Sequence, residues 1–334
     1  MQTKKLETPI YRTLWKIQAL PVFCSDCFAA ANIVTIRPVH WFVLLCLVLV
    51  WGSSYLMIEI ALRAWQPAQI TGLRILLAAM VLLASVVLSR SSIPLDRRTW
   101  AFFLIIAVIG NCLPFFLISW GQQHVESGLA GILAASTPLA VLILSHFILP
   151  DERLRPRHLA SFMLCFTGIV VLMGPDSLAA LGGGGGNRLL AQFAILGGAI
   201  CYALATVIAR RMPPVSPLVT STGVMILASG LMTPFIVDGA AVLPDAGGPA
   251  MLALGFLGVL GTGAASILYF YLINRTGARF TSLLNYLVPV WALLLGATIL
   301  GEKFPISTWF ALILIISGLT LISRSDDIVP RSEG

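Results

Sequence analysis

The sequence predicts an all-α polytopic membrane protein with ten transmembrane helices, arranged as two inverted five-helix repeats. Three observations carry this prediction: an apolar composition, basic residues that gather on alternate loops, and a set of landmarks that occurs twice. Of the 334 residues, 58% are hydrophobic and only 10% are charged, and the mean hydropathy is +0.94. Soluble domains average about 45–50% apolar and about 25% charged residues, so this composition excludes a soluble fold and a disordered chain.

Long unbroken apolar runs identify the helices, because a transmembrane helix needs about 20 apolar residues. A transmembrane β-barrel would instead show segments of about ten residues with alternating polarity. The short stretches between the runs leave no room for a soluble catalytic domain. The ten predicted spans are 41–61, 68–89, 100–119, 128–149, 159–174, 189–209, 217–237, 250–273, 281–300 and 306–323.

The basic residues orient these spans in the membrane. If the N-terminus is cytoplasmic, most of the 21 lysines and arginines fall on the cytoplasmic side, and the loops on the opposite side hold only Arg63, Arg188 and Lys303. Cytoplasmic loops of membrane proteins carry such an excess of Lys and Arg. One missed or invented span would destroy this alternation, so it supports ten spans with both termini in the cytoplasm.

A duplication divides the chain into two halves. Each copy has a proline within a span, a glutamate after that span and a glycine in the next span, and 16 residues separate the glutamate from the glycine in both copies. Matched landmarks at matched spacing indicate two related halves of five spans each. The landmarks are Pro138, Glu152 and Gly168 in the first copy, and Pro289, Glu302 and Gly318 in the second.

Five is an odd number, so the second copy enters the membrane from the opposite side. Inverted repeats are the architecture of secondary transporters, in which two similar halves exchange conformations around one central site. A duplication kept for folding alone is the alternative at this point. The predicted organisation is a cytoplasmic tail at 1–39, a first repeat at 40–175, a Gly-rich external linker at 176–188, a second repeat at 189–323 and a cytoplasmic tail at 324–334.

Short motifs within this pattern resemble the drug/metabolite transporter superfamily. Residues 50–55 read VWGSSY, residues 67–69 read PAQ and residues 72–74 read GLR, and both halves end in the proline, glutamate and glycine landmarks. Over about residues 40–323 the chain is similar to the ten-helix EamA-type permeases. The resemblance implies two five-helix repeats around a central cavity, and movement of small organic solutes, often as efflux. Glu59 departs from the family pattern, which implies a neutral or basic residue there.

Ionisable groups inside spans are costly unless they are paired or hydrated, so they mark candidate functional positions. Glu59 in the first span and Arg74 in the second are the clearest, and they flank the same short outer loop. Their depths differ by roughly 7 Å at about 1.5 Å per residue, so we expect them to approach one another beside the outer end of a cavity. Such a pair would respond to substrate charge or to protons, or it would be a structural ion pair between two spans.

Polar and aromatic side chains in the spans are the other candidates for a binding cavity. Trp51 and Tyr55 lie one helical turn apart and can line a cavity with aromatic faces, whereas Ser54 can hydrogen-bond across a helix interface. Pro289 releases the carbonyl of Asn285 from its helix. Tight helix packing is the alternative for each of them. The complete set of predicted substrate-binding residues is Trp51, Ser54, Tyr55, Glu59, Arg74, Asn111, Tyr202, Tyr269, Asn285, Tyr286 and Trp291.

The sequence contains no motif for a cofactor, a metal or a nucleotide. The patterns G-x-x-x-x-G-K-[ST] and H-E-x-x-H are both absent, so neither ATP hydrolysis nor a zinc protease site is indicated. Cys24 and Cys27 form one CxxC without the second pair of ligands that a closed zinc site needs. We therefore expect no cofactor, no metal site and no enzymatic activity.

These observations together predict a secondary transporter that moves small organic solutes across a bacterial inner membrane by alternating access, in the direction of efflux. The expected partners are a small-molecule substrate and membrane lipid. Nucleic acid is not expected, because the positive charge follows the membrane loops. Proton coupling through Glu59 and a homodimer are left open. The rival interpretations are a channel and a lipid-modifying membrane enzyme. An enzyme would need paired acids or histidines, and the strongest such cluster consists only of Asp151, Glu152 and His158.

Overall fold

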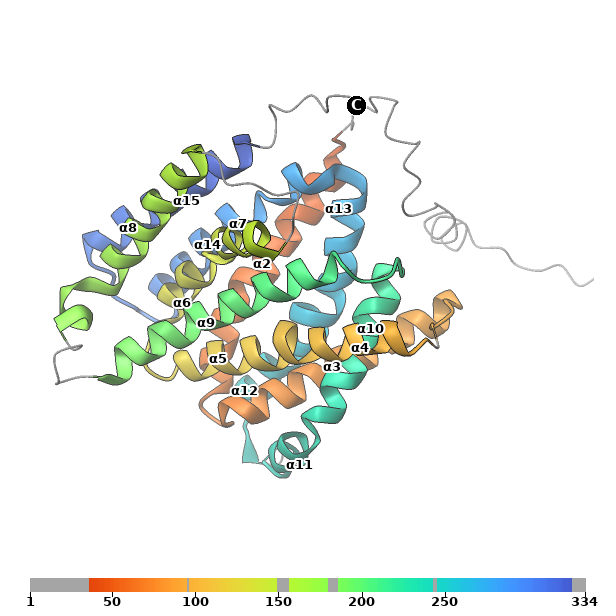
Figure 1. The fold of residues 1–334 in the computed structure, drawn as a ribbon. Helices are drawn as coiled ribbons and strands as arrows, with labels where there is room; N and C mark the ends of the chain where they lie inside the picture. The colour runs from red at the N-terminus through yellow and green to blue at the C-terminus, as the bar shows by residue number, and fades with distance from the viewer. Residues whose placement is uncertain (1–35, 95, 149–155, 180–185, 243–244, 326–334) are drawn as a thin grey trace, which may run out of the picture.

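The chain folds into a bundle of helices, drawn in Figure 1 from a computed structural model. The structure describes residues 36–94, 96–148, 156–179, 186–242 and 245–325. Every regular element within these ranges is a helix, and no strand occurs in them. Cys24, Cys27 and Glu152, together with residues 180–185 of the expected Gly-rich linker, lie outside the described residues.

The first half of the chain begins its helices with residues suited to helix starts. Pro38 and Pro67 occupy first-turn positions, where the missing N–H of proline costs no hydrogen bond. Asp96 caps the next helix by accepting a hydrogen bond from the Thr99 backbone N–H at 2.8 Å, and hydrogen bonds from Thr99 lower the pKa of the Asp96 carboxyl. The elements are α2 (Pro38–Ala61), α3 (Pro67–Ser89), α4 (Arg97–Ala107), η2 (Val108–Cys112), α5 (Leu113–Gly121), α6 (Ser127–Ala134), α7 (Thr137–Ile148) and α8 (Pro156–Ala179).

The second half follows the same order with one bend that the sequence pattern did not predict. One straight span is expected over 217–237, but α10 and α11 meet at an angle of 70°. Pro234 at the start of α11 explains the bend, because proline cannot extend the hydrogen-bond ladder of the preceding helix. The elements are α9 (Gly186–Ala209), α10 (Pro217–Leu231), α11 (Thr233–Ala241), α12 (Gly248–Gly255), η5 (Phe256–Ala264), α13 (Ala265–Thr281), α14 (Leu284–Ile299) and α15 (Ile306–Ser325).

The described helices correspond one for one to the ten predicted spans. Six helices, some of them continuous through a π-helical turn, are long and apolar enough to cross a membrane, and the α10–α11 pair adds a bent span. Three shorter apolar helices complete the set: His158–Gly174, Leu284–Ile299 and Ile306–Leu321. The chain is therefore an all-helical, multi-pass membrane protein, as the sequence predicts.

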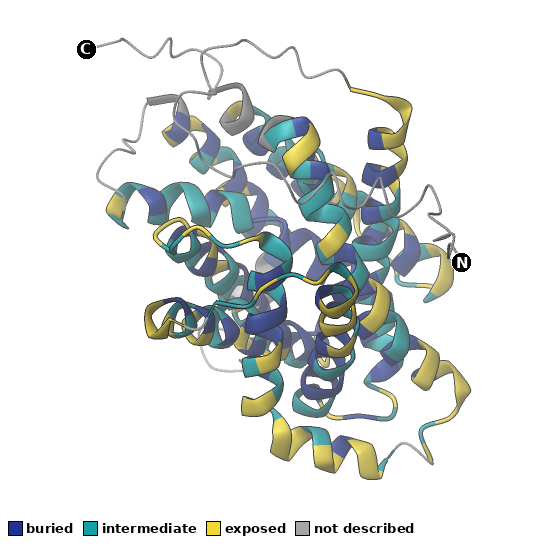
Figure 2. Ribbon diagram, turned by 90° about the vertical axis from the view of Figure 1, so that its right-hand side faces the viewer, coloured by how far each residue is buried: buried dark blue, intermediate teal, exposed yellow. Residues whose placement is uncertain are grey.

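The outer surface of the bundle is apolar, as a lipid-facing surface requires. Figure 2 shows buried residues where helices face one another and exposed residues on the outward faces. Leu88, Phe147 and Leu252 are each more than three-quarters exposed on such faces. Exposure of these apolar side chains to water would be unfavourable, whereas contact with the acyl chains of lipid is not.

The last helices of the two halves, α8 and α15, pack side by side along one edge of the bundle (Figure 1). Their contact uses the two landmark glycines. A side chain at Gly168 would overlap Ile315 of α15, and a side chain at Gly318 would overlap Cys165 of α8. Each glycine therefore permits close approach of the opposite helix. The two glycines thus hold equivalent places in the two halves, as expected for related repeats.

Candidate functional site

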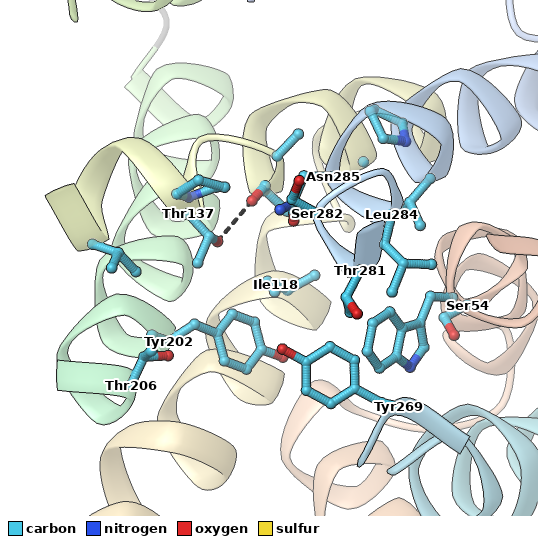
Figure 3. Close-up of a pocket in the computed structure, with 18 of the residues that line it drawn as sticks. Ser54, Ile118, Thr137, Tyr202, Thr206, Tyr269, Thr281, Ser282, Leu284 and Asn285 are labelled. Atoms are coloured by element: carbon cyan, nitrogen blue, oxygen red, sulfur yellow. Dashed lines mark hydrogen bonds between the residues drawn. The ribbon is translucent and has the colours of Figure 1, made fainter. Parts of the chain in front are cut away.

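A cavity of about 1090 Å³ is lined by helices from both halves of the chain. The first half contributes residues of α2, α3, η2 and α5 to α8, and the second half contributes residues of α9, α10, η5, α13 and α14. Figure 3 shows part of this lining, with tyrosine, threonine, serine and asparagine side chains directed toward the cavity.

Helix α2 presents one regular stripe of residues to the cavity. Trp51, Ser54, Tyr55 and Ile58 follow the spacing i, i+3, i+4 and i+7, which places them on a single face of a helix. The indole N–H of Trp51 donates a hydrogen bond of 3.1 Å to the Gly261 carbonyl in η5. The stripe is therefore tied to the second half of the chain.

Arg74 of α3 is the only charged side chain deep in the cavity wall among the described residues, and it is 7% exposed. Its Nε donates a hydrogen bond of 2.8 Å to the Thr262 hydroxyl, which in turn donates to the Leu257 carbonyl at 2.9 Å. The guanidinium carbon lies 4.0 Å from the centre of the Phe115 ring. Thr262 and Phe115 together fix the orientation of the guanidinium plane.

The two terminal nitrogens of Arg74 differ from its Nε. Within the described chain, no carbonyl, hydroxyl or carboxylate accepts a hydrogen bond from them. The side chain itself is part of the cavity lining. Arg74 therefore presents unused hydrogen-bond donors and a positive charge to whatever enters.

Aromatic rings from several helices surround this position. The ring centres of Phe115 and Tyr202 are 6.3 Å apart, and those of Trp51 and Tyr269 are 5.5 Å apart. Both tyrosine hydroxyls point into the cavity in Figure 3. Such rings offer apolar faces with a few polar handles, which suits an organic molecule with a flat or apolar body.

The two proline-bearing spans supply a polar region of the cavity. The span with Pro138 is broken between α6 and α7, and the Thr137 hydroxyl donates a hydrogen bond of 2.8 Å to the Ala134 carbonyl. That carbonyl is the one Pro138 cannot engage, so the hydroxyl replaces the missing partner. Asn285 lies opposite, at the start of α14 (Figure 3). The counterpart proline, Pro289, sits inside an unbroken helix.

The structure places the predicted substrate-binding residues in two groups. Glu59, Tyr286 and Trp291 are not part of the described lining. Tyr286 donates from its hydroxyl to the Leu319 carbonyl at 3.1 Å, and the Trp291 indole donates to the Ser53 hydroxyl at 3.1 Å, so both join helices. The residues that do line the cavity are Trp51, Ser54, Tyr55, Arg74, Asn111, Tyr202, Tyr269 and Asn285.

The expected approach of Glu59 and Arg74 was wrong, because the two residues form no ion pair in the structure. The charged groups that act on Glu59 are Glu302, Arg63 and Glu126, which lie at the end of the bundle whose loops the sequence predicts to face outward, called the outer end below. The helical period explains the separation: Glu59 is one residue beyond Ile58, about 100° around α2 from that stripe residue. The prediction compared the depths of Glu59 and Arg74 in the membrane, but it did not consider the directions in which their side chains leave their helices.

Sequence reasoning missed the residues that hold Arg74 in place. Thr262 is one of them, and it lies 188 positions from Arg74 in the chain. It is the only hydroxyl-bearing residue in the run FLGVLGTGA of η5, which was the one available signal. Phe115 could not be singled out from the sequence, because it is one apolar residue among many in its span. The described residues hold no group of three His, Cys, Asp or Glu side chains that could bind a metal ion.

Glu302, in the loop after α14, joins the two halves at the outer end of the bundle. Its carboxylate accepts hydrogen bonds from the backbone N–H groups of Ser127 at 2.8 Å and Gly128 at 3.1 Å, which are the first residues of α6. The carboxylate thus satisfies free donors and the positive end of that helix. Gly296 beneath it has no room for a side chain, which would overlap the Glu302 carboxylate. This landmark residue is a contact between the halves.

A protein-family model matches the chain twice. The model is described as the EamA-like transporter family, and it covers residues 40–174 and 189–324. The two matches include nearly all the spans, and they lie on either side of the expected linker.

Curated proteins from several bacteria are similar to the chain over most of their length. The "Uncharacterized inner membrane transporter YedA" of Escherichia coli strain K12 is 28% identical, over 86% of this chain and 91% of that protein. The "Protein PagO" of Salmonella typhimurium strain LT2 is 27% identical, over 85% and 93%. The "Uncharacterized transporter YoaV" of Bacillus subtilis strain 168 is 21% identical, over 81% and 92%.

A solved crystal structure of a protein with 23% sequence identity has the same fold. It superposes with a TM-score of 0.59, over 87% of this chain and 100% of that one. At this level of identity the likeness shows shared architecture alone.

Proposed function

The chain belongs to the EamA-like transporter family, and from that premise we propose that it is a secondary transporter that exports small organic solutes across the inner membrane by alternating access. The observation that carries the proposal is the cavity of about 1090 Å³ between two halves that both match the family. Its volume lies just above the range of about 300–1,000 Å³ that is usual for small-molecule pockets, so it has room for an organic solute.

Equivalent features in the two halves support an inverted repeat. The third and eighth spans both contain a π-helical turn that contributes to the cavity, η2 with Asn111 and η5 with Thr262. The fifth and tenth spans pack on one another through their landmark glycines. Two halves that hold equivalent structures at one shared cavity are able to exchange conformations, which is the basis of alternating access.

The shape of the cavity supports loading from the cytoplasm. Its lining includes His146, His158 and Arg210, which lie near the helix ends that the basic loops assign to the cytoplasm. Toward the other side the α2 stripe stops at Ile58, and Glu302 ties α6 to the second half. A substrate would thus reach Arg74 from the inside in this conformation, as export requires.

Reconstitution separates the transporter from its rivals. The protein in liposomes should show saturable counterflow of a labelled solute when a panel of amino acids, bases and organic acids is screened. Ionic conductance without saturation would indicate a channel, and chemical change of a lipid would indicate an enzyme. Either result would overturn the proposal.

Cysteine labelling in intact cells tests the inverted arrangement. We expect a membrane-impermeant thiol reagent to label Arg63→Cys, in the first loop of the first half, from outside. It should label Met212→Cys, in the equivalent loop of the second half, only after the cells are permeabilised. The parent protein, which keeps its native cysteines, provides the background. Labelling of both variants from the same side would contradict two halves of opposite orientation.

A further inference from the structure

We propose that the cavity binds organic monocarboxylates, with the carboxylate held by the two terminal nitrogens of Arg74 and the apolar body against the neighbouring aromatic rings. This inference rests on the proposed function, because it names the class of solute that the transporter carries. Three features of the described residues support it: the free donors of Arg74, the charge of the cavity lining, and the rings around the guanidinium.

The donors of Arg74 are arranged to receive two oxygens. The Nε is occupied by Thr262 at 2.8 Å, and Phe115 packs against the guanidinium plane at 4.0 Å, so the plane is fixed. The terminal nitrogens have no acceptor in the described chain, and the Arg74 side chain is part of the cavity lining. A fixed guanidinium with free terminal donors matches the planar, two-oxygen geometry of a carboxylate.

No carboxylate of the described lining balances the charge of Arg74. Among the described lining residues there is no Asp or Glu, and Glu59 forms no pair with Arg74. Arg210 is the other arginine, but it lies beyond the end of α9 and has an interaction of its own. An isolated buried cation is unfavourable, so an anionic solute would supply the missing charge.

The surroundings of Arg74 favour one negative charge on an apolar body. A monocarboxylate would form a neutral complex with the single deep arginine, whereas a phosphate dianion would leave net charge among apolar groups. Tyr202, Phe115 and Tyr55 border the same space and offer ring faces to the body of the solute. A free ammonium group would find no carboxylate among the described lining residues.

The charge of such a solute also favours export. A monocarboxylate that leaves the cell carries one negative charge outward, which an inside-negative membrane potential drives. A potential of 100 mV corresponds to a concentration ratio of roughly fifty-fold at equilibrium. No proton carrier is then needed, and Glu59 lies outside the described lining.

Calorimetric titration of the purified full-length protein tests the proposal with three probes that share a phenyl ring. We expect the anion 3-phenylpropanoate to bind most tightly, zwitterionic phenylalanine more weakly, and cationic 2-phenylethylamine not measurably. Arg74→Gln should weaken 3-phenylpropanoate binding about 10- to 100-fold, because hydrogen bonds to a charged group are lost. Arg74→Lys should retain part of the affinity, because it keeps the charge but not the planar fork.

Arg188→Gln is the matched control, since Arg188 is an exposed arginine at the outer end and should leave binding unchanged. Thermal melting of each purified variant establishes that it is folded. Unchanged affinity in folded Arg74→Gln, or equal binding of the amine and the carboxylate, would overturn the proposal. So would the failure of 3-phenylpropanoate and of a panel of alkyl and indolyl monocarboxylates to bind at millimolar concentration.

Flux measurements distinguish this inference from the proposed function. Counterflow of a neutral or cationic solute, without flux of any monocarboxylate, would remove the carboxylate preference and leave the transporter intact. Arg74-dependent binding of 3-phenylpropanoate without flux of any solute would do the reverse. Outward accumulation that follows an imposed membrane potential, with no imposed pH gradient, is the result expected if both are right.

Discussion

The cavity wall and the outer end of the bundle differ in how completely the protein hydrogen-bonds their charged side chains. In the cavity wall, Arg74 is bound by protein only through its Nε, and its terminal donors have no acceptor in the described chain. At the outer end, both oxygens of Glu302 accept backbone hydrogen bonds from α6, and Glu126 pairs with Arg188. Both regions join the two halves, but of the two charged groups only Arg74 keeps donors without an acceptor in the described chain.

This difference separates function from structure. A charge whose hydrogen bonds are all made by the protein contributes to the folded state, so its removal should lower stability. A charge that keeps free donors in a cavity contributes little to the fold, and its removal should affect what the cavity binds. Four variants test this division.

Arg74→Gln should reduce transport by about 10- to 100-fold and leave the stability of the empty protein unchanged or higher. The reason is that the guanidinium is only 7% exposed and has no carboxylate beside it among the described lining residues, so its charge is unfavourable until an anionic substrate binds. The measurements are initial rates in proteoliposomes and thermal melting without substrate. Glu59→Gln is the control and should change neither. A large decrease in the melting temperature of Arg74→Gln would show that Arg74 stabilises the fold and would contradict the distinction between binding and structural charges.

Gly296→Ala should lower the free energy of unfolding by about 2–4 kcal/mol, because its methyl group would overlap the Glu302 carboxylate and displace it from α6. Unfolding of the purified protein by a denaturing detergent provides the measurement. Gly255→Ala is the matched control, since its added methyl group meets open space in a helix. That control should be neutral or stabilising by about 0.5–1 kcal/mol. Similar losses in both variants would show that packing at Gly296 is not special.

Glu302→Gln should lower the free energy of unfolding by about 1–2 kcal/mol, because the amide keeps one acceptor but loses the charge at the helix N-terminus. The same detergent titration measures it. Combination with Gly296→Ala should be less than additive, since both changes remove the same contact between Glu302 and α6. Fully additive losses would mean that Gly296 acts through another neighbour.

The fold was largely predictable from the sequence, because lipid imposes a simple rule on composition. Apolar runs had to match helices, and the predicted runs 68–89 and 159–174 differ by one residue from the apolar helices Pro67–Ser89 and His158–Gly174. The bend before Pro234 was missed because an apolar run looks the same whether its helix is straight or bent. A proline at a helix start was the available signal.

The site was predictable only in part, because helices that are apolar nearly all round conceal which face is turned inward. Trp51, Ser54 and Tyr55 line the cavity, and their shared spacing identifies the inward stripe of α2. Glu59 was matched to Arg74 by depth, although the same spacing places it off that stripe. Thr262, the actual partner of Arg74, comes from the other half of the chain, where no local pattern could reveal the contact.

Arg188→Ala should have the smallest effect, a loss of about 0.2–1 kcal/mol that fades in high salt. Its guanidinium lies 2.9 Å from Glu126, but the two side chains are 52% and 36% exposed, so water screens the attraction and solvates whichever partner is left. Melting at low and high salt gives the measurement, with Arg63→Ala, another exposed arginine of the outer end, as the control. The pair joins the start of α9 to the residue before α6, next to the Glu302 contact. A loss larger than that of Glu302→Gln would place the main connection at the exposed rim and not at the buried carboxylate.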